Sequence, residues 1–221
     1  MDVIVSAAVS LDGYLDDCSA DRLKLSGDRD WESVLRLRAE CDAILVGAGT
    51  LRKDNPSLVI RDPELRRRRT LQGMPEDITK VTLTASGRLD PGLAFFTEGA
   101  GGKIVFAPLS ADDEGLQAFS DAAEVVRGEN ITAASICAAL AARGCKRLMV
   151  EGGTQILTMF FAEDAVDRLR LAVAPFFVGE GGAPRFVAPA LFPWNKSRRM
   201  ELERVEMLDD MAVMYYKMDR V

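Results

Sequence analysis

Short apolar runs alternate with amphipathic stretches along the first three quarters of the chain. The run at 3–10 is apolar at nearly every position, as in a strand buried on both faces. Five comparable runs predict further strands, at 42–47, 80–84, 102–107, 123–127 and 146–150. Helical spacing of apolar residues lies between several of them, at 28–41, 112–120, 132–143 and 154–162. The alternation predicts a three-layer α/β/α fold with a mainly parallel central sheet.

The last quarter of the chain has a different pattern. Residues 166–179 form a long alternating segment, and 199–208 and 211–218 are joined by Asp209-Asp210, which is typical of a hairpin. Antiparallel C-terminal strands are therefore expected at one edge of the sheet. We expect a single domain over 1–221, because no interdomain linker is visible. The polar stretch 61–77 is predicted to be a solvated loop, since its arginines belong to an acidic protein.

Composition narrows the range of functions. The 221 residues are 48% hydrophobic, and 34 acidic against 28 basic residues give a net charge of −6, which disfavours nucleic acid as a partner and favours a small molecule. No apolar run approaches the roughly 20 residues that span a bilayer, so a cytoplasmic location without membrane association is expected. The chain has no histidine, which excludes a Ser-His-Asp triad or a His-containing zinc site. No metal site is predicted.

Three glycine-containing motifs follow predicted strands. "GAGT" (47–50) would present N–H groups at a helix start, or be structural only; it is not a G-x-G-x-x-G fingerprint, because Arg52 stands at the third glycine position. "VEGGT" (150–154) places Glu151 after a buried strand, where it meets a ligand or caps a helix. "SLDG" (10–13) is by itself a turn.

In this order and spacing, the chain resembles the reductase domain of the riboflavin-pathway deaminase/reductase family, whose fold is that of dihydrofolate reductase. The resemblance covers essentially the whole chain. It is carried by "SLDG", "LRAECDAILVGAGTLRKDNPSLVIR", "VTLTASGRLDP", "LMVEGGTQIL" and "VDRLRLAVAPFFVGEGGAPRF". It implies an NADPH-dependent oxidoreductase that reduces the ribosyl group of a phosphorylated pyrimidine ribosylamine to a ribityl group. It also implies a homodimer.

The resemblance assigns roles residue by residue. NADPH is expected to contact Ala8, Thr50, Asp54, Ser86 (or Ala85 beside it), Gly152, Gly153, Thr154, Gln155, Ile156 and Leu157. The substrate is expected to contact Arg38, Leu58, Arg61 and Glu151. The two arginines suit a phosphate, and Glu151 can accept hydrogen bonds from pyrimidine N–H groups. Asp54 and Glu151 are the expected catalytic residues, with Asp54 assisting proton transfer and Glu151 anchoring the base.

One segment departs from the family pattern. Many bacterial members have Ser-x-Trp where this sequence has Arg22 and Lys24, in "RLKLSGD". The substrate could therefore be the diamino-pyrimidinone, the deaminated amino-uracil or another compound. Two alternatives remain open: a dihydrofolate-reductase-like enzyme acting on a pterin or specialised metabolite, and a non-catalytic nucleotide-binding protein. Four residues are candidates for binding the 2′-phosphate that distinguishes NADPH from NADH: Arg52, Lys53, Ser86 and Arg88.

Overall fold

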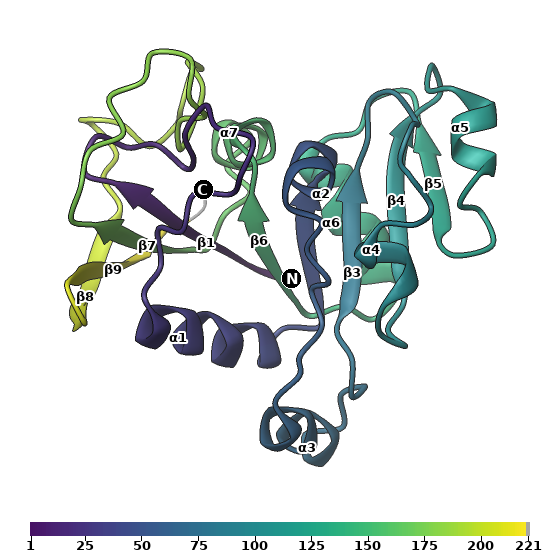
Figure 1. Ribbon diagram of the computed structural model, residues 1–221, viewed down its shortest axis with the longest axis horizontal. Coiled ribbons are helices and arrows are strands. Elements are labelled where there is room, and N and C mark those ends of the chain that lie inside the picture. Colours follow the sequence, from purple (N-terminus) through teal and green to yellow (C-terminus); the bar gives the residue numbers. More distant parts are fainter. Residues whose placement is uncertain (220–221) are drawn as a thin grey trace. The chain divides into compact units, whose positions relative to one another are not determined.

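The computed structural model describes residues 1–219 and divides into two compact units (Figure 1). The first unit contains Met1 and Arg36–Leu148, and the second contains Asp2–Leu35 and the chain from Met149 onward. The chain passes between units within helix α1 (Asp28–Ala39) and within strand β6 (Arg147–Gly152). Arg220 and Val221, the end of the expected 1–221 domain, lie outside the described residues. The single domain stays a prediction.

The first unit is built on four parallel strands in the order β5-β4-β3-β2. Their bounds are β2 Ala43–Gly47, β3 Thr79–Leu83, β4 Lys103–Pro108 and β5 Glu124–Gly128. All five residues of β2 are buried, as expected for a strand covered on both faces. Four helices lie in the connections between these strands: α2 Ala48–Asp54, α3 Pro63–Leu71, α4 Ala94–Thr97 and α5 Asp113–Gln117. Helix α6 (Ala133–Ala142) follows β5. The parallel order places the carboxyl ends of β2 and β3 side by side.

The prediction of a loop over 61–77 is wrong for its central part, which is helix α3. Asp62 accepts hydrogen bonds from the backbone N–H groups of Glu64 and Leu65, and Pro63 occupies the first helical position. Buried hydrogen bonds attach the helix to the rest of the unit. The guanidinium of Arg69 donates to the carbonyls of Ala39, Cys41 and Pro75. The arginine-rich composition does not predict a helix, yet α3 forms and places the guanidinium of Arg69 in the core.

The second unit orders its strands β6-β1-β7-β9-β8. β1 (Asp2–Ser10) pairs parallel with β7 (Arg168–Ala174). β9 (Met211–Lys217) pairs antiparallel with β7 and with β8 (Glu201–Leu208), which confirms the C-terminal hairpin. β7 ends at Ala174, five residues before the predicted strand does, and Pro175, which has no N–H to donate, follows it. Helix α7 (Thr154–Ala162) follows β6 directly.

A buried ion pair holds the start of α1 in the second unit. Asp30 is fully buried and accepts from the guanidinium of Arg170 in β7, which is 2% exposed. Tyr215, the register partner of Arg170 in β9, packs its ring beside the same guanidinium. Removing one member of such a pair leaves a buried charge without its counter-ion, so the pair fixes where the helix starts.

The pairing pattern confirms the predicted fold class. Parallel strands flanked by helices dominate, and the antiparallel pairs involve the C-terminal strands β8 and β9. Every helix among the described residues is too short or too polar to cross a membrane.

Candidate active site

The end of β6 combines a carboxylate with an unusual backbone. Glu151 is half-buried, and the two glycines after it have positive φ angles of 128° at Gly152 and 69° at Gly153. Residues other than glycine rarely adopt such angles. Gly153 is the N-cap of the nine-residue helix α7, and no side chain caps its first turn. The strand end therefore offers backbone N–H groups at the positive end of a helix, as in anion-binding turns.

Residues 185–188, in the same unit, form hydrogen bonds with two side chains of α7. The hydroxyl of Thr154 donates to the carbonyl of Arg185 at 2.5 Å, and one turn later the hydroxyl of Thr158 accepts from the N–H of Ala188 at 2.8 Å. Arg185 also stacks over the ring of Tyr14 at 4.4 Å and donates to its hydroxyl. Contacts within the protein therefore hold the turn that carries Gly153 and Thr154.

The motif "SLDG" forms the predicted turn at the end of β1. The N–H of Gly13 donates to the carbonyl of Ser10 at 2.9 Å. Burial alone would raise the pKa of Asp12, but hydrogen bonds from the Ser10 hydroxyl and from the backbone N–H groups of Val178 and Gly179 outweigh it and lower the pKa to about 2. Asp12 thus ties the first turn to the loop after β7.

In the first unit, helix α2 starts directly at the end of β2. Gly47 is its N-cap, so Ala48, Gly49 and Thr50 belong to the helix and not to a turn. Thr50 and Asp54 are four residues apart and share one helix face, and both are half-buried. This spacing agrees with the prediction that both contact one ligand.

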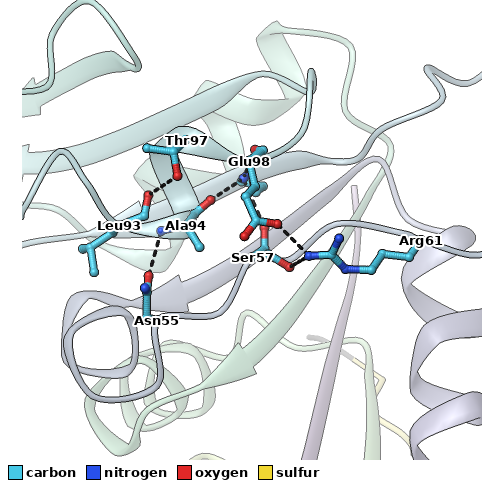
Figure 2. A network of polar contacts seen from close by, with 8 residues as sticks. Asn55, Ser57, Arg61, Leu93, Ala94, Thr97 and Glu98 are labelled. Atoms are coloured by element: carbon cyan, nitrogen blue, oxygen red, sulfur yellow. Dashed lines mark hydrogen bonds and ion pairs between the residues drawn. The ribbon is translucent and has the colours of Figure 1, made fainter.

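The segment after α2 carries two of the predicted substrate residues. Leu58 is buried, with 2% exposure, and has a left-handed φ of 55°, while Asn55 at the helix end has a φ of 41°. A left-handed leucine costs of order 1–3 kcal/mol, so the surrounding contacts dictate this conformation. Arg61 donates through Nη2 to Glu98 Oε2 at 2.6 Å and to the hydroxyl of Ser57 at 3.4 Å (Figure 2).

A buried lysine lies behind this segment. Lys80 in β3 is 1% exposed, and its amine donates to the carbonyls of Ser57, Ala94 and Glu98 at 3.1, 3.4 and 2.7 Å. Burial, together with the nearby charge of Lys103, lowers its pKa to about 8. Sequence analysis missed Lys80 and Glu98. The signal for Lys80 was a lysine at the start of the apolar run "KVTLT".

Basic residues gather near Ser86. Arg52 Nη2 lies 3.4 Å from the Ser86 hydroxyl and 2.8 Å from the carbonyl of Arg88, whose own N–H donates to the same hydroxyl. The side chain of Arg88 pairs with Asp112 at 2.7 Å, and this hydrogen bond raises the pKa of Arg88. The exposed Ser86 hydroxyl therefore lies beside the Arg52 guanidinium and the backbone N–H of Arg88, whose own guanidinium pairs with Asp112.

The predicted residues fall into two sets. The second unit brings together Ala8, Glu151, Gly152, Gly153, Thr154, Gln155, Ile156 and Leu157, with Ala8 in β1, the neighbour of β6. The first unit carries Arg38, Thr50, Asp54, Leu58, Arg61 and Ser86. Arg38 lies in the last turn of α1 and is 5% exposed. In the described part of the chain, no three Cys, Asp or Glu side chains are arranged to hold a metal ion.

The strand topology and the Gly152–Gly153 turn after β6 define an α/β protein of the dihydrofolate-reductase-like class. The chain belongs to the RibD C-terminal domain family, whose model matches residues 1–214. This confirms the family predicted from the motifs.

Two archaeal relatives match over nearly their whole length. The chain is 33% identical over 205 residues to the 2,5-diamino-6-ribosylamino-4(3H)-pyrimidinone 5′-phosphate reductase of Archaeoglobus fulgidus, covering 92% of this chain and 93% of the relative. A protein of the same name from Methanothermobacter thermautotrophicus is 27% identical, covering 97% and 96%. A pyrimidine reductase-like protein from Corynebacterium diphtheriae has the same fold, with a TM-score of 0.86 at 24% identity, covering 100% of this chain and 92% of that one.

Proposed function

We propose that this protein is an NADPH-dependent reductase of riboflavin biosynthesis that converts the ribosylamino group of a pyrimidine ribosylamine 5′-phosphate to a ribitylamino group. The observation that carries the proposal is the 33% identity to the Archaeoglobus fulgidus reductase over almost the full length of both chains. The diamino-pyrimidinone named for that relative is the first substrate to test. The deaminated amino-uracil is the second.

The residues fit a dinucleotide with a 2′-phosphate. The uncapped α7 turn at Gly152–Gly153 can receive an anionic pyrophosphate. Arg52, whose guanidinium lies beside Ser86, supplies positive charge for the 2′-phosphate. The residues assigned to NADPH are Ala8, Thr50, Asp54, Ser86, Gly152, Gly153, Thr154, Gln155, Ile156 and Leu157.

On the substrate side, the proposal assigns Arg38 and Arg61 to the phosphate, Leu58 to apolar contact and Glu151 to the pyrimidine N–H groups. Bound NADPH supplies a hydride to C1′ of the ring-opened ribosylamine, which is an imine. The imine nitrogen then needs one proton, and Asp54 assists its delivery. The protein otherwise contributes orientation, because positioning alone lowers the barrier by several kcal/mol, about 7–11 in the best-aligned cases.

The alternatives differ from this proposal in measurable ways. A pterin reductase of the same fold would also oxidise NADPH, but its substrate carries no phosphate. A non-catalytic nucleotide-binding protein would oxidise none. We further propose a cytoplasmic homodimer that acts on a small molecule, without nucleic acid or membrane as a partner.

The test follows NADPH absorbance at about 340 nm, a property of the cofactor. The diamino substrate, its deaminated form and dihydrofolate are compared with the wild-type protein and with Arg38→Ala and Arg61→Ala. Loss of one charge-assisted hydrogen bond, worth about 1.5–3 kcal/mol, should raise KM for a phosphorylated substrate about 10- to 100-fold, with little change in kcat. Oxidation with dihydrofolate alone, or with none of the three, would refute the proposal.

A further inference from the structure

Arg61 forms an ion pair with a carboxylate of the protein itself, that of Glu98. Its Nη2 donates to Glu98 Oε2 at 2.6 Å, and both side chains are exposed, 70% for Arg61 and 42% for Glu98. Among the described residues, this guanidinium donates hydrogen bonds through Nη2 alone, to Glu98 and to the Ser57 hydroxyl. Glu98 therefore neutralises Arg61 on one side and leaves its other N–H groups open to solvent.

The backbone of Glu98 is fixed close to this arginine. The amine of Lys80 donates to the Glu98 carbonyl at 2.7 Å, and the Glu98 N–H donates to the carbonyl of Ala94 at 3.1 Å. The N–H of Ala94 in turn donates to Asn55 Oδ1 at 2.7 Å, as Figure 2 shows. Glu98 therefore presents its carboxylate from an anchored position.

The segment that carries Arg61 is tied to the same anchor. Lys80 also donates to the carbonyl of Ser57 at 3.1 Å, and Asn55 lies at the start of the segment. The buried lysine thus ties the backbone of Glu98 to the segment that carries Arg61, at Ser57, four residues before the arginine.

We propose that Glu98 is an intramolecular competitor that occupies Arg61 Nη2 until the substrate phosphate displaces it. The inference rests on the proposed function, which assigns Arg61 to that phosphate. An anion that binds Arg61 through Nη2 must displace Glu98, so its apparent Kd is the intrinsic Kd divided by the fraction of protein in which the Arg61–Glu98 pair is open. The factor is the same for every anion, so Glu98 lowers the affinity of Arg61 for all of them and leaves the ratio of their affinities unchanged.

A phosphate monoester displaces Glu98 more readily than a free carboxylate does, because its intrinsic affinity for the guanidinium is higher. It carries a charge of about −1.5 to −2 at neutral pH and three acceptor oxygens, so it can engage two N–H groups of the guanidinium at once. A free carboxylate offers Arg61 no more than Glu98 does, and Glu98 has the advantage of being attached.

The test is Glu98→Gln, which keeps the size of the side chain and removes its charge. Ribose 5-phosphate is titrated into the full-length protein at pH 7.5 without NADPH, and Kd is read from NMR chemical-shift changes. Exposed ion pairs are weak, so we expect Kd to fall roughly two- to fivefold. A Kd that is unchanged or higher would overturn the inference, because Glu98 would then be neutral or would orient Arg61 productively.

Two controls separate displacement of Glu98 from a general effect of charge. Glu76→Gln removes another exposed carboxylate, paired with Arg66 at 2.9 Å in the same unit, and should leave Kd unchanged. In an Arg61→Ala background, Glu98→Gln should have no effect. A similar gain in either control contradicts the inference.

The outcomes also distinguish this inference from the proposed function. If wild-type protein reduces none of the pyrimidine substrates but Glu98→Gln still tightens ribose 5-phosphate binding through Arg61, the function fails and the inference stands. If Arg61→Ala binds ribose 5-phosphate as wild type does, the assignment of Arg61 to phosphate fails and the inference falls with it.

Discussion

Lys80 and Arg69 place two positive charges inside the first unit, and both donate to backbone carbonyls. Arg69 donates to three carbonyls around the start of β2 and the end of α3, and Lys80 donates to three around the segment that carries Arg61. Burial lowers the pKa of both side chains, but the ordinary pKa of an arginine is so high that Arg69 stays charged. The lysine, with a pKa of about 8, titrates near neutral pH.

This titration predicts how stability depends on pH. The folded-state pKa of Lys80 lies below the value of 10.5 expected when unfolded, so between about pH 8 and 10.5 the unfolded chain binds the extra proton. Stability contributed by Lys80 therefore rises with pH across this window, by up to about 1.4 kcal/mol per pH unit. In urea unfolding, wild type should gain about 1–2 kcal/mol relative to Lys80→Met between pH 7 and pH 9.5.

The comparison with the variant is needed because Cys145 acts in the opposite direction. Burial raises its pKa from 9.0 to about 11, so the folded state keeps that proton longer and loses stability as pH rises through this window. Lys80→Met leaves Cys145 intact, and the difference between the two proteins isolates the lysine. A constant difference from pH 7 to 9.5 would contradict the assignment.

At the scale of elements, apolar periodicity was enough to place most strands but not helix α3. The segment "PELRRRRTL" has no apolar stripe, and its helix is recognisable only from Asp62 as N-cap and Pro63 at the first position. It buries Leu65 and Arg69, and an arginine is rarely buried. The segment 166–179 was predicted too long, because Pro175 interrupts the alternating pattern after Ala174.

In the candidate site too, local sequence patterns predicted some residues and missed others. Glu151, Gly152 and Gly153 were found because strand, carboxylate and glycines are contiguous in the sequence. Glu98 was not, because it lies 37 residues from Arg61, and only the folded chain brings the two together. Contacts over such separations follow from tertiary packing, which no local pattern encodes.

The β6–α7 turn gives a prediction at this scale. Gly152 has a φ of 128°, and a Cβ added there would meet only Leu157 Cδ1, at an ordinary 3.9 Å. The cost of Gly152→Ala is therefore backbone strain, of order 1–3 kcal/mol, and not a clash. Because the turn must relax to relieve that strain, NADPH affinity should fall at least tenfold, as measured by nicotinamide fluorescence.

Gly181→Ala is the matched control, since Gly181 has no positive φ and a Cβ there meets no atom within 4 Å. It should leave NADPH affinity and stability unchanged. Equal NADPH affinity in the two variants would show that the turn does not contact the cofactor.

For the whole molecule, the strand order leaves β8 at an edge of the second unit. Three of its large apolar side chains are exposed: Leu202 at 51%, Val205 at 57% and Met207 at 80%. An exposed apolar edge strand invites pairing with another chain, and monomers rarely leave such a strand uncovered. The net charge of −6 opposes association only weakly at physiological salt, where exposed charges are screened beyond about 8 Å.

We therefore expect β8 to form the interface of the proposed homodimer. Light scattering coupled to size exclusion should give twice the 24.1 kDa chain mass for wild type, and the single-chain mass for Val205→Lys, because a buried unpaired ammonium costs several kcal/mol. Leu71→Lys is the control: it adds the same charge at a leucine of α3 that is 74% exposed in the other unit, and it should remain a dimer. A wild-type protein that is monomeric, or a Val205→Lys variant as dimeric as Leu71→Lys, would show that β8 is not the interface.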